Sequence, residues 1–194
     1  MTCLVLASAS TSRARILSGA GVAFAVQPAH IDEDAVKTSG ADGQAVAAEL
    51  AERKALRVSA SRPGDLVLGA DQVLVCDGAI LSKAETLADA AAQLKFLRGK
   101  PHTLISALAL ARGGAVVWRH AEEARLRMRD FSDTFLDSYL KAEAEDVLGS
   151  VGCYRLEGPG AQLFDSVEGD YFSILGLPLL PLLGVLRQQG VIPR

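Results

Sequence analysis

Hydroxyl side chains alternate shortly after the start of the chain and lead into an arginine. Ser8, Ser10 and Ser12 are followed by Arg13, where a helical apolar pattern begins. The free N–H groups and the dipole of a helix N-terminus favour negative charge, and hydroxyl and guanidinium groups can complete the shell around an anion. The stretch therefore predicts an anion-binding turn. The commoner role, in which Ser10 or Ser12 only caps the helix, stays open at this point.

A second polar group follows an apolar strand. The run from Leu66 to Ala70 predicts a central strand, with Asp71 and Gln72 at its C-terminal end. A hairpin that turns on Asp77-Gly78 then brings Lys83 back behind a return strand. An acid at a strand end with a lysine beside it is typical of the chemistry that open α/β sheets place there. A plain strand-terminating role for Asp71 is the alternative.

Two further charged residues have ordinary explanations as well as functional ones. Glu33 lies in a run of three acids, from Asp32 to Asp34, that follows a predicted short strand. Such a run is usually a solvated loop, and a cation partner is the alternative. Lys54 lies near the apolar stripe of a helix predicted from about Gly43 to Ala60, where a lysine usually keeps its ammonium group in solvent.

The rest of the pattern alternates strands and helices that must position these residues. Thr86 and Ser132 predict helix starts, and Gly113-Gly114 predicts a hairpin turn whose second strand alternates apolar residues with arginines. The glycine-rich segment from Gly152 to Gly160 is expected to be a loop held close to a neighbour. Strands are expected at about residues 4–7, 22–27, 66–70, 73–75, 79–81 and 102–111 and from 115 onward, and the last helix is expected to end near residue 190.

The composition excludes several classes of protein. Twenty basic and twenty-three acidic side chains give a net charge of −3, which does not indicate a nucleic-acid polymer as partner. The cysteines are odd in number and scattered, and the histidines are isolated, so neither a disulfide framework nor a structural zinc site is expected. No signal peptide is apparent, and the most apolar run, from Ile174 to Leu186, is too short to span a bilayer. A soluble, cytoplasmic protein without a membrane partner is expected.

Taken together, the motifs resemble the Maf family of nucleoside triphosphate pyrophosphatases nearly from end to end. Each motif alone is weak, whereas their order and spacing make a specific match. The matching pieces are Leu6-Ala-Ser-Ala-Ser10 with Arg13, Asp32-Glu33, Lys54-Ala55, Gly69-Ala-Asp71, Lys83, Gly152-Cys-Tyr154 with Glu157-Gly158, and Gly169-Asp-Tyr171 with Gly176-Leu-Pro-Leu179.

The resemblance implies a fold and a reaction. The fold would be α/β, with a mixed, strongly twisted sheet, flanking helices and two lobes around a central cleft, similar to the inosine triphosphatases. It would form a single domain over residues 1–194. The reaction would be hydrolysis between the α- and β-phosphates of a nucleoside triphosphate, giving a monophosphate and pyrophosphate, with a divalent cation (Mg²⁺ or Mn²⁺). The family also suggests a homodimer, although no stretch reads as an obvious interface.

The resemblance also implies roles for single residues. Asp71 matches the general base, which would orient or deprotonate the attacking water. Glu33, together with Asp71, would be a ligand of the hard divalent cation. The residues implied to hold phosphate oxygens or to neutralise charge on the phosphoryl group are Ser8, Ser10, Arg13, Lys54 and Lys83.

Three positions depart from the commonest family pattern. Many members have an arginine, a threonine and a glutamine where this chain has Ser12, Gln72 and Glu157. This combination resembles the branch that takes 7-methyl-GTP rather than the branch that takes dTTP and UTP. Glu157 could accept hydrogen bonds from the guanine N1–H and amine, and its charge suits a cationic methylated base. Gln72 could supply a further donor or acceptor. Ala84 stands where members usually have a proline after Lys83, which affects only the rigidity of that loop.

Removal of a modified nucleotide, with 7-methyl-GTP as substrate, is therefore the function expected first. Two others stay open: a dTTP or UTP pyrophosphatase, and a nucleotide-binding regulator of cell division with little turnover. An unrelated α/β domain with solvated charges would require all the motif matches to be accidental.

Overall fold

The computed structural model describes residues 3–193, and the chain divides into two compact units. Unit 1 comprises residues 1–72, 106–122 and 171–194, and unit 2 comprises residues 73–105 and 123–170. The strands are β1 (Leu4–Leu6), β2 (Phe24–Val26), β3 (Leu66–Cys76), β4 (Ala79–Leu81), β5 (Pro101–Arg112), β6 (Ala115–Met128) and β7 (Phe164–Glu168). The helices are α1 (Thr11–Gly19), α2 (Asp34–Lys37), α3 (Gly43–Ser59), α4 (Leu87–Leu97), α5 (Asp133–Glu143), α6 (Tyr171–Ile174) and α7 (Leu179–Gln188), with 3-10 helices η1 (Ala144–Gly149) and η2 (Pro159–Leu163).

The strands form a mixed sheet in the order β2-β1-β3-β5-β6-β7, and β4 also pairs with β3. β1 is parallel to both β2 and β3, whereas the β3–β4 and β6–β7 pairs are antiparallel. Strands β3, β5 and β6 each contribute residues to both units, so each unit is assembled from separate stretches of chain. The expected α/β fold with a mixed sheet and flanking helices is confirmed.

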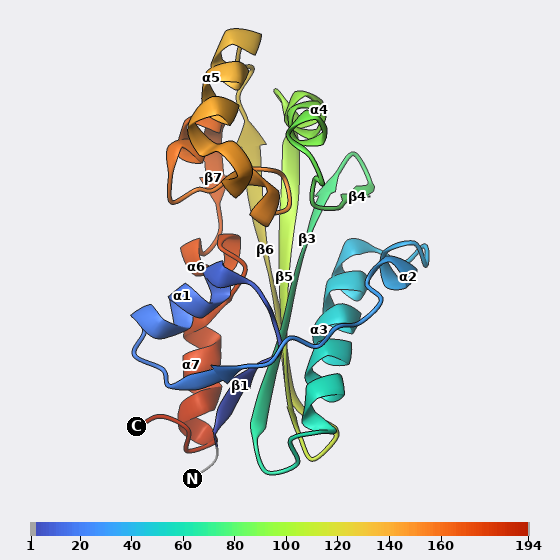
Figure 1. Cartoon of the computed structure of the whole chain (residues 1–194), viewed down its shortest axis with the longest axis vertical. Helices are drawn as coiled ribbons and strands as arrows, with labels where there is room; N and C mark the ends of the chain where they lie inside the picture. Colours follow the sequence, from blue (N-terminus) through green and yellow to red (C-terminus); the bar gives the residue numbers. More distant parts are fainter. Residues whose placement is uncertain (1–2, 194) are drawn as a thin grey trace. The chain divides into compact units, whose positions relative to one another are not determined.

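Unit 1 buries both faces of its strands. Leu66 and Leu68 of β3 belong to an apolar cluster with residues of α1 and α7, whereas Val67 packs with Val58 of α3. Figure 1 shows α3 on one side of these strands and α1 and α7 on the other. Because successive strand residues point to opposite faces, a strand covered on both sides favours apolar residues at every position. This preference explains the continuous apolar run at the start of β3.

Helix α3 approaches β3 very closely at one glycine. A Cβ atom on Gly69 would lie 2.0 Å from the Ala51 carbonyl oxygen and 2.6 Å from the Ala55 backbone nitrogen. Residues 67, 69 and 71 share one face of the strand, so the Asp71 side chain points toward the same helix. The close approach therefore places Lys54, on that helix, opposite Asp71.

Unit 2 has a buried polar and aromatic cluster of its own. His102 Nε2 lies 2.8 Å from the Tyr154 hydroxyl oxygen, and the Tyr154 ring meets Phe164 edge-on with ring centroids 4.8 Å apart. Burial lowers the pKa of His102 to about 4, against a smaller raising effect of the Lys100 backbone. The imidazole is therefore neutral at pH 7. Burial also raises the pKa of Tyr154 well above its ordinary value, so its hydroxyl stays protonated.

The glycine-rich segment of unit 2 is held tightly, as its composition predicts. A Cβ atom on Gly152, whose φ is +83°, would lie 2.7 Å from Leu74 Cδ1. Arg155 follows in the same segment, and its Nε lies 2.8 Å from Oε2 of Glu143, whose side chain is only 3% exposed. The segment is thus fixed by close packing and by an ion pair to a buried carboxylate.

Several predicted boundaries agree with the structure. Ser10 caps α1, and Thr86 caps α4 in a capping box with Asp89. The hairpin between β5 and β6 turns on Gly113 and Gly114, which both have positive φ. In these cases the local sequence alone determines the backbone, because caps and turns depend on residue type at fixed positions.

The predicted end of β3 is wrong. The strand was expected to stop at Ala70, but it continues through Asp71 and Gln72 to Cys76. Both polar residues stay in the strand because their side chains find partners on opposite faces: Asp71 with Lys54, and Gln72 with Ser106. Asp71 therefore does not terminate the strand.

None of the helices within residues 3–193 is long and apolar enough to cross a membrane. The three cysteines are free thiols, as their spacing predicts. The single domain over residues 1–194 and the cytoplasmic location stay predictions.

Candidate active site

Helix α1 begins at the turn for which the sequence predicts anion binding. The Ser10 Oγ accepts a hydrogen bond from the Arg13 backbone N–H at 3.4 Å, and the Ser8 Oγ accepts one from the Ser10 backbone N–H at 3.3 Å. The capping role is therefore confirmed for Ser10. It does not exclude anion binding, because one cap satisfies only one of the free N–H groups in the first turn of a helix. The turn directly follows β1, at the carboxyl end of a parallel strand.

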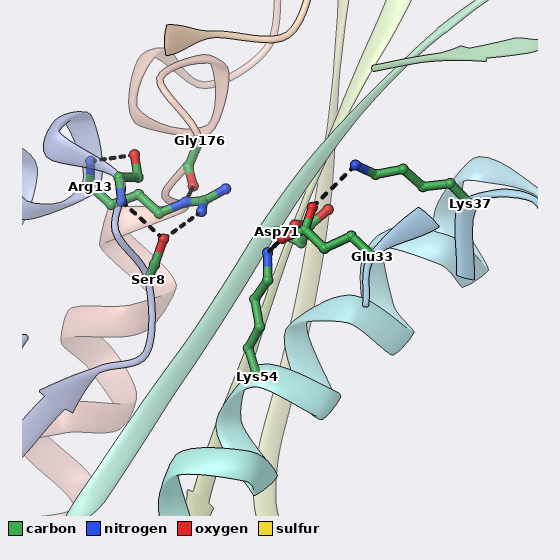
Figure 2. Close-up of polar contacts among 8 residues, drawn as sticks. Ser8, Arg13, Glu33, Lys37, Lys54, Asp71 and Gly176 are labelled. Atoms are coloured by element: carbon green, nitrogen blue, oxygen red, sulfur yellow. Dashed lines mark hydrogen bonds and ion pairs between the residues drawn. The ribbon is translucent and has the colours of Figure 1, made fainter. Parts of the chain in front are cut away.

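The Arg13 side chain is buried beside this turn. Its Nη1 donates to Ser8 Oγ and its Nε donates to the Gly176 carbonyl oxygen, each at 2.9 Å (Figure 2). Burial lowers the pKa of Arg13, whereas the negative charges of Asp71 and Glu33 act in the opposite direction. A guanidinium keeps its charge in proteins. Arg13 is therefore a fixed, buried cation that feels the charge of both acids.

Lys54 lies between two carboxylates. Its Nζ is 2.6 Å from Asp71 Oδ1 and 2.6 Å from Glu33 Oε1, and Figure 2 shows its side chain reaching from α3 to both acids. The side chains of Lys54 and Asp71 are only 10% and 6% exposed. The ordinary alternative for Lys54, in which its ammonium group stays in solvent, therefore does not apply. The charge can be buried because two carboxylates replace the water that it loses.

Glu33 is held by a second lysine. Lys37 Nζ lies 3.1 Å from Glu33 Oε2, one helical turn along α2. Burial alone would raise the pKa of Glu33, but hydrogen bonds and charges from Lys54 and Lys37 outweigh it and lower the pKa to about 2. Glu33 is therefore ionised at neutral pH and paired through both oxygens, unlike an acid in a solvated loop.

Asp71 keeps one oxygen unpaired. Its Oδ2 is buried, and no residue within 3–193 hydrogen-bonds to it. The same part of the chain contains no group of three or more His, Cys, Asp and Glu side chains that could hold a metal ion by itself. Mg²⁺ usually takes one or two carboxylates and completes its shell with water and substrate phosphate. The unpaired oxygen of Asp71 and the neighbouring Glu33 carboxylate fit that kind of binding, and the metal stays a prediction.

Two of the predicted specificity residues contact one turn of the chain, residues 173–176. Ser12 Oγ donates to the Leu175 carbonyl oxygen at 3.1 Å. Gln72 Nε2 donates toward the carbonyl oxygens of Ser173 and Ile174, at 3.1 and 3.0 Å. These contacts place both side chains at the turn that also receives Arg13. Their role in choosing a base stays a prediction.

Lys83 and Glu157 belong to unit 2, and their predicted roles stay predictions. Lys83 is exposed and lies two residues beyond the end of β4, which pairs with β3 from Ala79 to Leu81. Glu157 is exposed in the segment between η1 and η2.

Three residues that contact the predicted site were missed from the sequence. Lys37 had a usable signal, because it lies four positions after Glu33 at the spacing of helical ion pairs. Ser106 had a weaker one, as the single polar residue in the run from Leu104 to Ala111. Gly176 belongs to a matching family motif but was given no role of its own, since it contributes its carbonyl oxygen rather than a side chain.

The arrangement combines two capabilities in unit 1. The α1 N-terminus with the buried Arg13 can bind anionic oxygens. The Lys54–Asp71 pair offers a carboxylate with a free oxygen, which can orient or deprotonate a water molecule, beside an ammonium that stabilises negative charge. These are the parts that hydrolysis of a phosphorylated ligand requires.

Comparison with known proteins agrees with this chemistry. The family model described as Maf-like protein matches residues 3–189. A nucleoside triphosphate pyrophosphatase of Granulibacter bethesdensis is 53% identical over 96% of this chain and 96% of its own. The corresponding protein of Paramagnetospirillum magneticum is 54% identical over 96% and 98%. A 7-methyl-GTP pyrophosphatase of Rhizobium etli is 47% identical over 97% of both chains.

A solved nucleoside-triphosphatase (dITP/XTP pyrophosphatase) of Mycobacterium abscessus aligns with 99% of this chain and 98% of its own, at a TM-score of 0.45 and 15% identity. That similarity is too weak to support an argument. The family model, in contrast, spans nearly the whole sequence, and the relatives match from end to end. The chain belongs to the Maf family.

Proposed function

We propose that the protein hydrolyses a nucleoside triphosphate to the monophosphate and pyrophosphate, and that 7-methyl-GTP is its preferred substrate. The observation that carries the first part is the buried Lys54–Asp71 pair, with one free carboxylate oxygen, in the same unit as the Arg13 anion site. Relatives that match from end to end are named nucleoside triphosphate pyrophosphatases, which supports the reaction class.

The phosphate chain would be held at the N-terminus of α1. The hydroxyl groups of Ser8 and Ser10, the free backbone N–H groups of the first turn and the Arg13 guanidinium can donate to phosphate oxygens. Arg13 is already oriented by its bonds to Ser8 and Gly176, so little side-chain freedom is lost on binding.

Asp71 would act on the attacking water. Its Oδ1 is engaged by Lys54, so Oδ2 is the oxygen that can accept the water proton while the water oxygen bonds to the reacting phosphorus. The bond to the bridging oxygen breaks, and pyrophosphate leaves with the electron pair. Lys54, together with Lys83 in the role that the family implies, would stabilise the charge that develops on the phosphoryl group.

A divalent cation, Mg²⁺ or Mn²⁺, would supply charge neutralisation at the phosphates when bound, held by Asp71 and Glu33. Both carboxylates already contact Lys54. The Lys54 ammonium therefore keeps the two acids close together even without a metal ion.

The proposal of 7-methyl-GTP rests on Ser12, Gln72 and Glu157. Glu157 is exposed, so its carboxylate can accept from a base edge and attract the positive charge of a methylated guanine. The Rhizobium etli relative named 7-methyl-GTP pyrophosphatase supports the same base. A preference for dTTP or UTP is the alternative.

The test is kcat/KM for 7-methyl-GTP, GTP, dTTP, UTP and CTP side by side with Mg²⁺ or Mn²⁺, since that ratio defines specificity. We expect pyrophosphate release, and the highest value for 7-methyl-GTP. Cleavage of dTTP or UTP far above 7-methyl-GTP would refute the base preference alone. Release of pyrophosphate from none of the triphosphates would refute the enzymatic proposal.

A single substitution tests the role of Asp71. We expect Asp71→Asn to lower kcat about 10²- to 10⁴-fold, because the amide cannot accept the water proton, while nucleotide affinity changes less than about tenfold. Asp137→Asn is the matched control, since Asp137 is an exposed aspartate of α5. Equal turnover of the two variants would contradict the role of Asp71. A wild-type protein that binds nucleotide without turnover would instead indicate a regulator.

A further inference from the structure

Four consecutive carbonyl oxygens, from Ser173 to Gly176, accept hydrogen bonds from side chains of the predicted site and its surroundings. Three of the donors come from positions that the proposed function assigns to phosphate or base binding. The bonds are Ser106 Oγ and Gln72 Nε2 to Ser173, Gln72 Nε2 to Ile174, Ser12 Oγ to Leu175 and Arg13 Nε to Gly176. We call residues 173–176 the carbonyl turn.

The carbonyl turn is itself fixed within unit 1. The Ser173 hydroxyl donates a short hydrogen bond to Glu122 Oε2, and Glu122 Oε1 lies 2.8 Å from His120 Nε2. His120 in turn stacks on Trp118, with nearly parallel rings whose centroids are 5.6 Å apart. The acceptors that Gln72 meets are therefore held in place from outside the site.

The contacts determine which way the Gln72 amide points. Among the described residues, the amide's three partners all lie within hydrogen-bond distance of Nε2 and share its two protons. They are Ser106 Oγ and the carbonyls of Ser173 and Ile174. The reversed amide would set Oε1 against two carbonyl oxygens, which only accept. Ser106 Oγ gives its own proton to the Ser173 carbonyl oxygen at 2.7 Å, so it presents a lone pair to Gln72 Nε2.

The opposite end of the amide lies near Arg13, the cation of the proposed anion site. A Cβ atom on Gly176 would lie 3.6 Å from Gln72 Oε1 and 3.7 Å from both Arg13 Nε and Nη2. The Gln72 oxygen and the Arg13 guanidinium thus flank the same position, where the chain has only a glycine hydrogen. This is the side on which a nucleotide bound by Arg13 would come close.

We propose that Ser106 is a positioning residue that, with the carbonyl turn, fixes Gln72 as a hydrogen-bond acceptor for an N–H group of the substrate base. The inference rests on the proposed function and deepens it. Of the two options that the amide has by itself, donor or acceptor, only the acceptor is left for the ligand. Gln72 would then favour a base that carries a ring N–H or an exocyclic amine within its reach, as guanine does.

The test measures binding and needs no turnover. The probes are the α,β-methylene triphosphates of guanosine, inosine (no exocyclic amine) and N1-methylguanosine (no N1–H), titrated calorimetrically with Mg²⁺ present. We expect the wild type to bind at least one of the two analogues about tenfold more weakly than the guanosine compound, because the acceptor loses its donor. In Ser106→Ala, the ratio of the analogue's Kd to the Kd of the guanosine compound should fall to about threefold or less.

Two further variants control for folding and for general loosening of the site. Ser106→Thr keeps the hydroxyl and should keep the ratio. Gln72→Met removes the acceptor at similar length and should abolish the ratio even if Ser106→Ala does not fold. A wild type without discrimination, or a Ser106→Ala variant that weakens all three compounds by one factor, overturns the inference. If the wild type binds none of the compounds, the proposed function fails with it.

Discussion

At the scale of single residues, the central feature is an ammonium shared by two acids. Lys54 contacts Asp71 and Glu33 at the same distance, 2.6 Å, and it is nearly buried. Taking charged groups such as those of Lys54 and Asp71 out of water is costly unless each keeps a partner. The cluster is therefore sensitive to the loss of any member.

We expect Lys54→Met to destabilise the protein by about 3 kcal/mol at pH 7, because Asp71 would be left buried and unpaired. We also expect kcat to fall at least about a hundredfold, since the charge beside the phosphoryl group is lost. Urea unfolding with a chelator present measures the first effect, and pyrophosphate release the second.

Lys141→Met is the matched control, because Lys141 is an exposed lysine of α5. Its free energy of unfolding should change by less than about 0.5 kcal/mol. If Lys54→Met were as stable and active as this control, the shared ammonium would have no role.

The sequence indicated which residues belong to the site better than it indicated their surroundings. Asp71, Lys54 and Glu33 were predicted from family motifs, and the structure does bring these three together. Their burial could not be predicted, because a lysine near an apolar stripe usually reaches solvent. The partner that prevents this lies 17 positions away on another element. The carbonyl turn was missed because its contacts use backbone oxygens, which every residue has.

At the scale of elements, one contact sets the geometry of the site: the packing of α3 on β3 at Gly69. The strand carries Asp71 and the helix carries Lys54, so any change in the distance between the elements separates the two charges. Glycine at position 69 is the one residue type that allows the helix and strand to approach this closely, because a Cβ atom would overlap the Ala51 carbonyl oxygen.

We expect Gly69→Ala to lower the free energy of unfolding by about 3 kcal/mol or more, because backbone atoms rather than flexible side chains must move. The fraction of the Gly69→Ala variant that still folds should have lost most of its activity, because Asp71 and Lys54 are moved apart. Thermal unfolding and pyrophosphate release check the two effects. Gly19→Ala is the control: nothing lies within 4 Å of a Cβ there, and alanine in a helix is favoured by up to about 1 kcal/mol. Equal stability of the two variants would contradict the close contact.

Elements with local signals were predicted well, and the error in the end of β3 has a tertiary cause. Thr86 and Asp89 form the capping box that starts α4, as residue type and spacing suggest. β3 was predicted too short because Asp71 and Gln72 resemble the end of a strand. They remain in the strand because Lys54 and Ser106, from other elements, satisfy them. A pattern along one segment does not contain those partners.

At the scale of the whole molecule, each compact unit contains a group whose pKa is lowered well into the acidic range. In unit 1 the pKa of Glu33 is lowered from 4.5 to about 2, despite burial, by Lys54 and Lys37. In unit 2 burial lowers the pKa of His102 from 6.5 to about 4. The resemblance predicted two lobes, but strands that supply residues to both units were not apparent from local patterns.

Both shifts make the unfolded chain bind protons more readily than the folded one, so stability must fall as the pH falls. For His102 the loss occurs between pH 6.5 and 4 and amounts to about 3 kcal/mol. For Glu33 it occurs between pH 4.5 and 2, and it is nearer 1 kcal/mol because the side chain is 37% exposed and screened by solvent. The windows barely overlap, so the two contributions can be separated.

We expect His102→Gln to weaken the dependence of the free energy of unfolding on pH only above about pH 4. Glu33→Gln should weaken that dependence only below about pH 4.5. Glutamine cannot titrate in this range, and in the first variant its amide can still meet the Tyr154 hydroxyl. Urea unfolding at half-unit pH steps, with a chelator present, measures both. Since the two residues lie in different units and share none of the partners found among residues 3–193, the double variant should show the sum of the two effects. A double variant that flattens more than this sum would mean that the two units do not respond to acid independently.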